Sequence, residues 1–121
     1  MTEKQFQNRV IKYLKSLPNT WLFKVWGGGF QKAGIPDLIC CINGVFVAIE
    51  LKAESGKATE LQKMNIKQIN AVGGIGVILY PAGFDTFKKI MEGVLTCSSH
   101  TAGLSALKSA NTNLNCDIKT N

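Results

Sequence analysis

The stretch DLICCINGVFVAIELK, residues 37–52, decides how this chain folds. Two apolar runs, Asp37 to Ile42 and Val45 to Leu51, flank Asn43-Gly44, and this dipeptide between apolar runs is the strongest short-range signal for a β-hairpin. Antiparallel pairing about the turn brings the start of the first strand to the end of the second. We therefore expect Asp37 and Glu50 to lie close together.

The second run of this hairpin has two different faces. Its odd-numbered residues, from Val45 to Leu51, are all aliphatic and predict a buried face. Its even-numbered residues change from apolar to charged, and Glu50 and Lys52 share the other face just after the small Ala48. A carboxylate and an ammonium together at the end of a buried strand indicate a functional site.

Upstream of the hairpin, the sequence predicts a helix and a strand. Apolar residues recur at helical spacing from Phe6 to Leu17, and Thr2 with Gln5 fits a capping box at the start of that helix. The aromatic and β-branched run from Trp21 to Trp26 predicts a strand, which must end at Gly27 to Gly29.

Downstream of the hairpin, Thr59 and Gln62 form a second possible capping box, opening a helix that ends at Gly73-Gly74. The apolar run from Ile75 to Tyr80 follows as a buried strand. A helix that connects two strands implies that they pair in parallel. The predicted fold is therefore α/β, with the order αβββαβ and a mixed central sheet flanked by helices.

Composition predicts one folded domain. The chain has 121 residues, of which 45% are hydrophobic and 18% charged, as in ordinary globular proteins. We assign residues 1–95 to the domain, including a last helix from about Phe84 to Leu95 whose apolar face would serve the core or a partner. Residues 96–121 are rich in Ser, Thr and Asn and are expected to form a loosely ordered polar tail.

The charge of the chain points to a polyanionic partner. The formal net charge is +6, and nucleic acid is the commonest polyanion bound by small basic domains, although many basic proteins bind none. The adjacent Cys40 and Cys41 are expected to be small buried residues, and without CxxC spacing neither a zinc site nor a disulfide scaffold is indicated. The absence of a signal-peptide pattern or an apolar spanning stretch favours a reducing cytoplasm.

Two carboxylates that meet at one point repel each other unless a cation lies between them. Hard divalent ions such as Mg²⁺ take oxygen ligands of this kind, so Asp37 and Glu50 predict a magnesium site, with the backbone carbonyl of Leu51 as a further ligand. Such an ion polarises a phosphodiester and lowers the pKa of bound water, while Lys52 would orient the water or neutralise developing charge. This is the chemistry of phosphodiester hydrolysis.

The motif Gly34-Ile35-Pro36-Asp37, followed by Glu50-Leu51-Lys52 and then Gln62, resembles the PD-(D/E)XK nucleases, and the VRR-NUC branch most closely. The resemblance covers roughly Thr2 to Leu95 and implies a restriction-endonuclease-like αβββαβ core. It also implies Mg²⁺-dependent or Mn²⁺-dependent cutting of branched DNA, including four-way (Holliday) junctions, by a homodimer. Short stand-alone members of the branch are often viral or bacterial.

The resemblance also assigns roles to residues. Asp37 and Glu50 would hold the metal, Lys52 would serve the attacking water, and Gln62 would support the site from its helix. Glu3 would be the N-terminal acidic residue of the family, and its place on the apolar stripe of the first helix would aim it inward toward the site.

Each of these residues also has a simpler interpretation. Asp37 would be a turn residue, and Glu50 with Lys52 a solvated strand end. Gln62 would only close its capping box, and Glu3 would only favour the helix dipole.

The glycine-rich loop is the second candidate site. Gly27 to Gly29 would be a plain loop, or Gly28 and Gly29 would let a phosphate backbone approach, with Gln31 and Lys32 beside it. Trp21 and Trp26 are interpreted as core or dimer-surface residues rather than as base-stacking platforms.

The leading hypothesis is a metal-dependent endodeoxyribonuclease. The alternatives are a DNA-binding module without catalysis and a general binding protein whose basic charge is incidental. The only histidine, His100, lies in the tail, which disfavours nuclease chemistry based on histidine.

Overall fold

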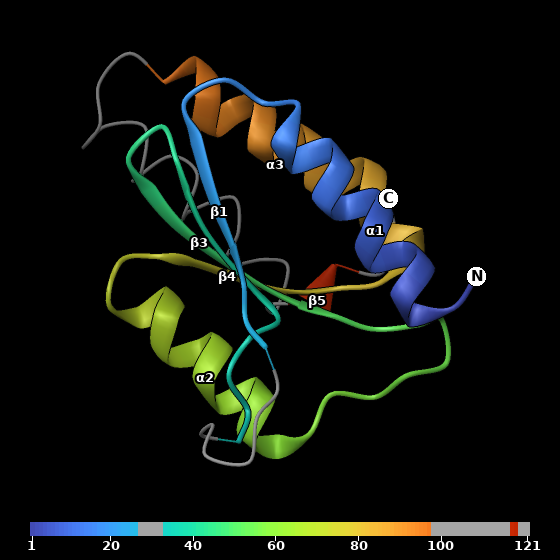
Figure 1. Cartoon of the computed structure of the whole chain (residues 1–121). Helices are drawn as coiled ribbons and strands as arrows, with labels where there is room; N and C mark the ends of the chain where they lie inside the picture. The colour runs from blue at the N-terminus through green and yellow to red at the C-terminus, as the bar shows by residue number, and fades with distance from the viewer. Residues whose placement is uncertain (27–32, 98–116, 119–121) are drawn as a thin grey trace.

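A computed structural model describes residues 1–26, 33–97 and 117–118 of the chain (Figure 1). The elements in chain order are α1 (Glu3–Lys15), β1 (Thr20–Lys24), β2 (Leu38–Ile42), β3 (Val45–Leu51), α2 (Glu60–Ala71), β4 (Ile75–Leu79), the 3-10 helix η1 (Pro81–Gly83), α3 (Phe84–Thr96) and β5 (Asp117–Ile118). The predicted α/β class and the αβββαβ order, followed by a helix, are confirmed.

The strands form one mixed sheet in the order β1-β2-β3-β4-β5. The first three strands pair antiparallel, while β4 lies parallel to β3 and β5 lies parallel to β4. The β2–β3 turn has the predicted form, since Asn43 and Gly44 have φ of 51° and 80°. Positive φ at both turn residues matches the right-handed twist of the flanking strands.

The two faces of the sheet are covered differently. Figure 1 shows α1 and α3 on one face and α2 on the other. The predicted aliphatic face of β3 packs against Phe6 of α1 and against Phe84, Phe87 and Met91 of α3 in a single core cluster. The apolar face of α3 therefore belongs to the core, which settles one of the alternatives left open by the sequence.

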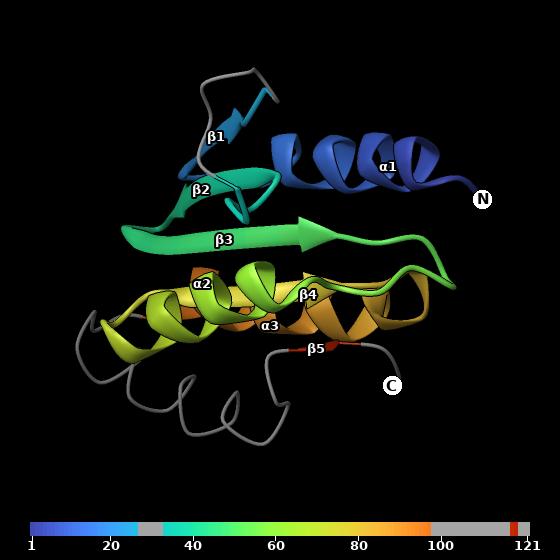
Figure 2. The ribbon, with the colours of Figure 1, turned by 90° about the horizontal axis from the view of Figure 1, so that it is seen from below.

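The opposite face has a smaller core. Ile66 of α2 packs there against Ile78 and Tyr80. A Cβ at Gly76 of β4 would lie 3.0 Å from the Ile66 carbonyl oxygen, so the glycine allows this close approach. In Figure 2, α2 lies in front of β4, whereas β1 and β2 are clear of it.

Two expectations differ from the structure. Cys40 is buried but Cys41 is exposed, because neighbouring strand residues point to opposite faces. Part of the predicted tail, Asp117–Ile118, pairs with β4 as an edge strand. Pairing of two residues through the backbone requires no hydrophobic pattern, so the sequence carried no signal for β5.

Candidate active site

Asp37 and Glu50 meet where the β2–β3 hairpin opens. Leu38 lies opposite Ile49, so the preceding Asp37 lies beside Glu50 at the end of β3. The backbone N–H of Leu51 donates a hydrogen bond of 2.9 Å to Asp37 Oδ2. This bond fixes the Asp37 side chain across the open end of the hairpin, as the turn at Asn43-Gly44 predicts.

Asp37, Glu50 and Lys52 form the cluster at this end of the hairpin. Within it Glu50 is buried, with only 3% of its surface exposed. Its Oε2 accepts a hydrogen bond of 2.9 Å from Gln62 Nε2 and lies 3.6 Å from Lys52 Nζ. Its other oxygen, Oε1, is buried and has no hydrogen-bond partner within the described part of the chain. A buried carboxylate oxygen without a partner is costly, and a bound cation would satisfy it.

The electrostatics of the cluster disfavour a charged Glu50. Its pKa is raised to about 8, first by burial and then by the nearby Asp37 carboxylate, against the lowering effect of Lys52. Two carboxylates in one partly buried site raise the cost of ionising both, and a divalent cation between them removes that cost.

Gln62 has both roles that the sequence offered as alternatives. Its side-chain Oε1 accepts a hydrogen bond of 2.9 Å from the Thr59 backbone N–H. The Gln62 backbone N–H donates to Thr59 Oγ1, which completes the capping box of α2. Because the amide oxygen is occupied by the cap, the NH₂ group is turned toward Glu50. The helix start therefore orients a hydrogen-bond donor into the site.

Asn65 positions the segment before Asp37, and the sequence analysis missed it. Its Nδ2 donates to the Gly34 carbonyl oxygen at 3.0 Å and to the Leu61 carbonyl oxygen at 3.0 Å. This contact fixes the Gly34 turn against α2, three residues before Asp37. No local sequence pattern marks this contact, because Asn65 and Gly34 are 31 positions apart.

Gly34 is expected to tolerate no side chain. It has φ of +83°, and a Cβ there would lie 2.9 Å from the Leu61 backbone carbon and from Asn65 Nδ2. We predict that Gly34→Ala lowers the free energy of unfolding by about 1–3 kcal/mol, as measured by urea denaturation. Gly56→Ala is the matched control, because its Cβ would meet its nearest atom at 3.3 Å without a positive φ. Equal stability of the two variants would contradict this role for Gly34.

Glu3 differs from its expected place. It is exposed in the first turn of α1, whereas Phe6, Val10 and Leu14 carry the buried stripe. α1 covers the sheet face opposite Glu50. The hydrogen bonds of the Asp37 and Glu50 side chains join them to Leu51 and Gln62, and neither bond involves Glu3. Its position matches the simpler interpretation, in which an acidic residue stabilises the helix N-terminus.

The second candidate site cannot be placed in the same way. Gly28, Gly29, Gln31 and Lys32 lie outside the described residues. Their predicted contact with a phosphate backbone stays a prediction.

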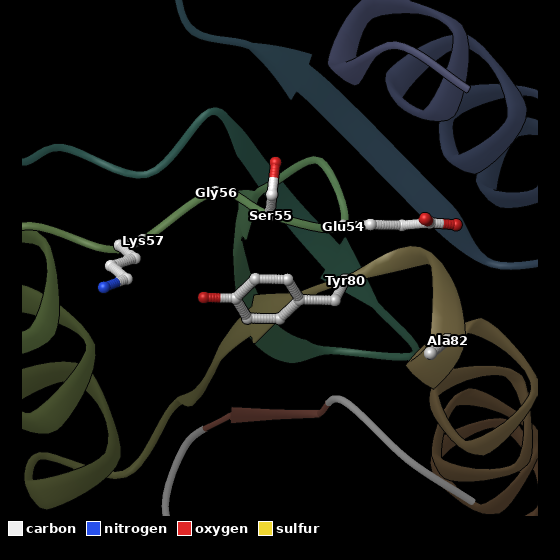
Figure 3. A pocket seen from close by; sticks show the side chains of 6 residues that line it. All are labelled: Glu54, Ser55, Gly56, Lys57, Tyr80 and Ala82. Atoms are coloured by element: carbon white, nitrogen blue, oxygen red, sulfur yellow. The ribbon is translucent and has the colours of Figure 1, made fainter.

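A pocket of about 330 Å³ lies beside the cluster and is lined by Glu54, Ser55, Gly56, Lys57, Tyr80 and Ala82. It adjoins Lys52, because a Cβ at Gly56 would lie 3.4 Å from Lys52 Cβ. Figure 3 shows the Tyr80 ring at its centre, with its hydroxyl directed toward the side of Lys57. The sequence analysis did not single out this pocket.

The residues present fit a magnesium ion. Within the described ranges, no three His, Cys, Asp or Glu side chains gather as one metal-binding group, and the cluster offers two carboxylates. Mg²⁺ is usually held by one or two carboxylates and keeps several waters, so Asp37 and Glu50 suffice. The unpartnered Oε1 of Glu50 is the atom that such an ion would satisfy.

Comparison of the chain with protein-family models, curated proteins and solved structures finds no match. Among the residues that the structure describes, no helix has the length and apolar character needed to cross a membrane.

Proposed function

We propose that this protein is a divalent-metal-dependent nuclease that hydrolyses phosphodiester bonds in DNA. The observation that carries the proposal is the buried Glu50, which lies beside Asp37 and Lys52 and has one oxygen without a hydrogen-bond partner among the residues that the structure describes. Retaining a buried carboxylate is costly, and such groups concentrate at functional sites. The net charge of +6 favours a polyanionic substrate.

The residues divide the chemistry among them. Asp37 and Glu50 would hold Mg²⁺ or Mn²⁺, and the Leu51 carbonyl is the proposed further ligand. When bound, the ion would lower the pKa of a water and polarise the phosphodiester. Gln62 holds Glu50 in place through a hydrogen bond of 2.9 Å. Lys52 supplies a positive charge close to Glu50, where negative charge develops on the phosphate during attack.

The preferred substrate is proposed to be branched DNA. This part of the proposal rests on the likeness of the Gly34 to Asp37, Glu50 to Lys52 and Gln62 motifs to the VRR-NUC branch, which also implies a homodimer. A junction or flap preferred over linear duplex would support it.

The experiment incubates labelled four-way junction, flap and linear duplex DNA with the protein in Mg²⁺, Mn²⁺ or EDTA. We expect cutting with either metal, none in EDTA, and none by Asp37→Asn. Asp85→Asn is the matched control, because Asp85 is an exposed acid in the first turn of α3. DNA binding under every condition without cutting would contradict the proposal and favour a non-catalytic DNA-binding module.

A further inference from the structure

Trp21 and Phe23 form an exposed aromatic strip on β1. Their exposed fractions are 59% and 49%, so Trp21 is not the core residue that the sequence interpretation allowed. Because Phe23 lies opposite Ile39, which lies opposite Ala48, the strip shares the sheet face of Glu50. In Figure 2, α2 lies in front of β4 and does not extend over β1.

The two rings are stacked on each other. Their planes are 8° from parallel, and their centroids are 6.0 Å apart. Exposed aromatic rings at alternate positions of a strand are the means by which several nucleic-acid-binding sheets stack unpaired bases. Stacking depends little on the base sequence of the DNA strand, because every base has a π-face.

The strip lies in register with the proposed cutting site. The Val25 N–H donates to the Asp37 carbonyl oxygen at 2.9 Å, so β1 runs directly alongside the residue before β2. Phe23 is separated from Glu50 by two strand spacings across the sheet and by two residues along β3. Together these correspond to about 12 Å between the two backbones.

Charge favours a nucleic-acid strand over a second copy of the chain. β1 has the sequence TWLFK and contains no acidic residue, and its Lys24 lies beside Phe23 in the chain. Lys24 Nζ lies 4.5 Å from the ring centroid of Trp26, so a cation stands close to the end of β1 that is nearer Asp37. A second copy on the strip would bring a strand of the same basic charge, whereas a DNA strand brings phosphates, so the proposed homodimer would use another face of the molecule.

We propose that the aromatic strip, Trp21 and Phe23, stacks unpaired nucleobases of a DNA strand that passes the Asp37–Glu50 cluster. The inference rests on the proposed nuclease function and refines its substrate class. The protein would then prefer DNA with unpaired bases close to the cut. A blunt duplex, whose bases are already stacked on each other, would gain nothing from the strip.

Tryptophan fluorescence tests the contact directly. The chain has two tryptophans, so a Trp26→Phe protein retains Trp21 as its single reporter. In EDTA, where cutting is not expected, we predict that a single-stranded oligonucleotide quenches Trp21 fluorescence and that a blunt duplex of the same length does not. Equal quenching by both, or by neither, would overturn the inference.

Matched variants separate stacking from general hydrophobic contact. Trp21→Leu and Phe23→Leu keep an apolar surface but lose the ring, and each is expected to weaken single-strand binding roughly 5- to 100-fold. Trp21→Phe and Phe23→Tyr keep a ring and should retain most of the affinity. Since both substituted positions are exposed, the fold should be preserved in all four variants, which circular dichroism would check.

Three further outcomes are distinguishable. If sedimentation shows that the wild type is a dimer and that the Leu variants are monomers, the strip is an interface between copies and the inference is wrong. If the wild type binds single strands through the strip but cuts no DNA in any metal, the nuclease proposal fails while the stacking contact stands. Equal cutting of paired and unpaired substrates would leave the nuclease proposal intact and overturn the proposal that the strip stacks unpaired bases.

Discussion

Glu50→Gln is expected to make the metal-free protein more stable and the nuclease inactive. The substitution replaces a buried carboxylate by a neutral amide of the same shape, and it should raise the free energy of unfolding at pH 8 by about 1–3 kcal/mol. It also removes a metal ligand, so cutting should fall by about 1000-fold or more. The two effects have opposite signs, which a residue with a purely structural role would not produce.

The gain in stability should depend on pH. The pKa of Glu50 is about 8 in the folded protein, whereas an ordinary Glu in an unfolded chain has a pKa of about 4.3. The folded state therefore binds more protons over this interval, and the stability of the metal-free wild type falls as pH rises from about 5 to about 8. Glu50→Gln lacks this titration, so the difference in free energy of unfolding between the variant and the wild type should increase over the same pH range.

Urea denaturation in EDTA at several pH values measures this difference, and repeating it in Mg²⁺ tests the metal. Mg²⁺ should stabilise the wild type and leave Glu50→Gln unchanged, because a ligand stabilises only a state that binds it. Glu60→Gln is the matched control, since Glu60 is exposed and forms a surface ion pair with Lys63. If Glu50→Gln were less stable than the wild type at pH 8, the carboxylate would be structural and the metal site would be wrong.

The hairpin could be predicted because its signals are local. Asn43-Gly44 fixes the turn, and the turn fixes the register that brings Asp37 to Glu50. Both capping boxes could also be predicted from the sequence, because each depends on two residues three positions apart. The core of the candidate site therefore followed from spacing alone.

Other features depend on contacts that no local pattern records. The hydrogen bond from Asn65 to Gly34 joins residues 31 positions apart, and neither residue type predicts it. Whether Trp21 and Phe23 are buried depends on how far α2 extends across the sheet, which is a tertiary property. The alternating pattern showed that β1 has two faces, but it could not show that one of them stays uncovered.

Lys52→Met is expected to reduce cutting by about 100- to 1000-fold while metal binding persists. Lys52 is mostly buried and lies 3.6 Å from Glu50 Oε2, so its charge acts within the cluster rather than in solvent. Methionine keeps much of the aliphatic stem and its packing but removes the charge. Because a cation repels Mg²⁺, its loss should leave the affinity for the metal equal or higher.

Isothermal titration with Mg²⁺ and single-turnover cutting together separate these roles, because Lys52→Met should fail only in the second assay and Glu50→Gln in both. Lys57→Met is the matched control: Lys57 is exposed, lines the neighbouring pocket and has no ion pair among those the structure gives to its described residues. Its loss should alter cutting by far less than the loss of Lys52. If Lys52→Met lost Mg²⁺ binding as Glu50→Gln does, Lys52 would be holding Glu50 in place and would have no direct part in stabilising the reacting phosphate.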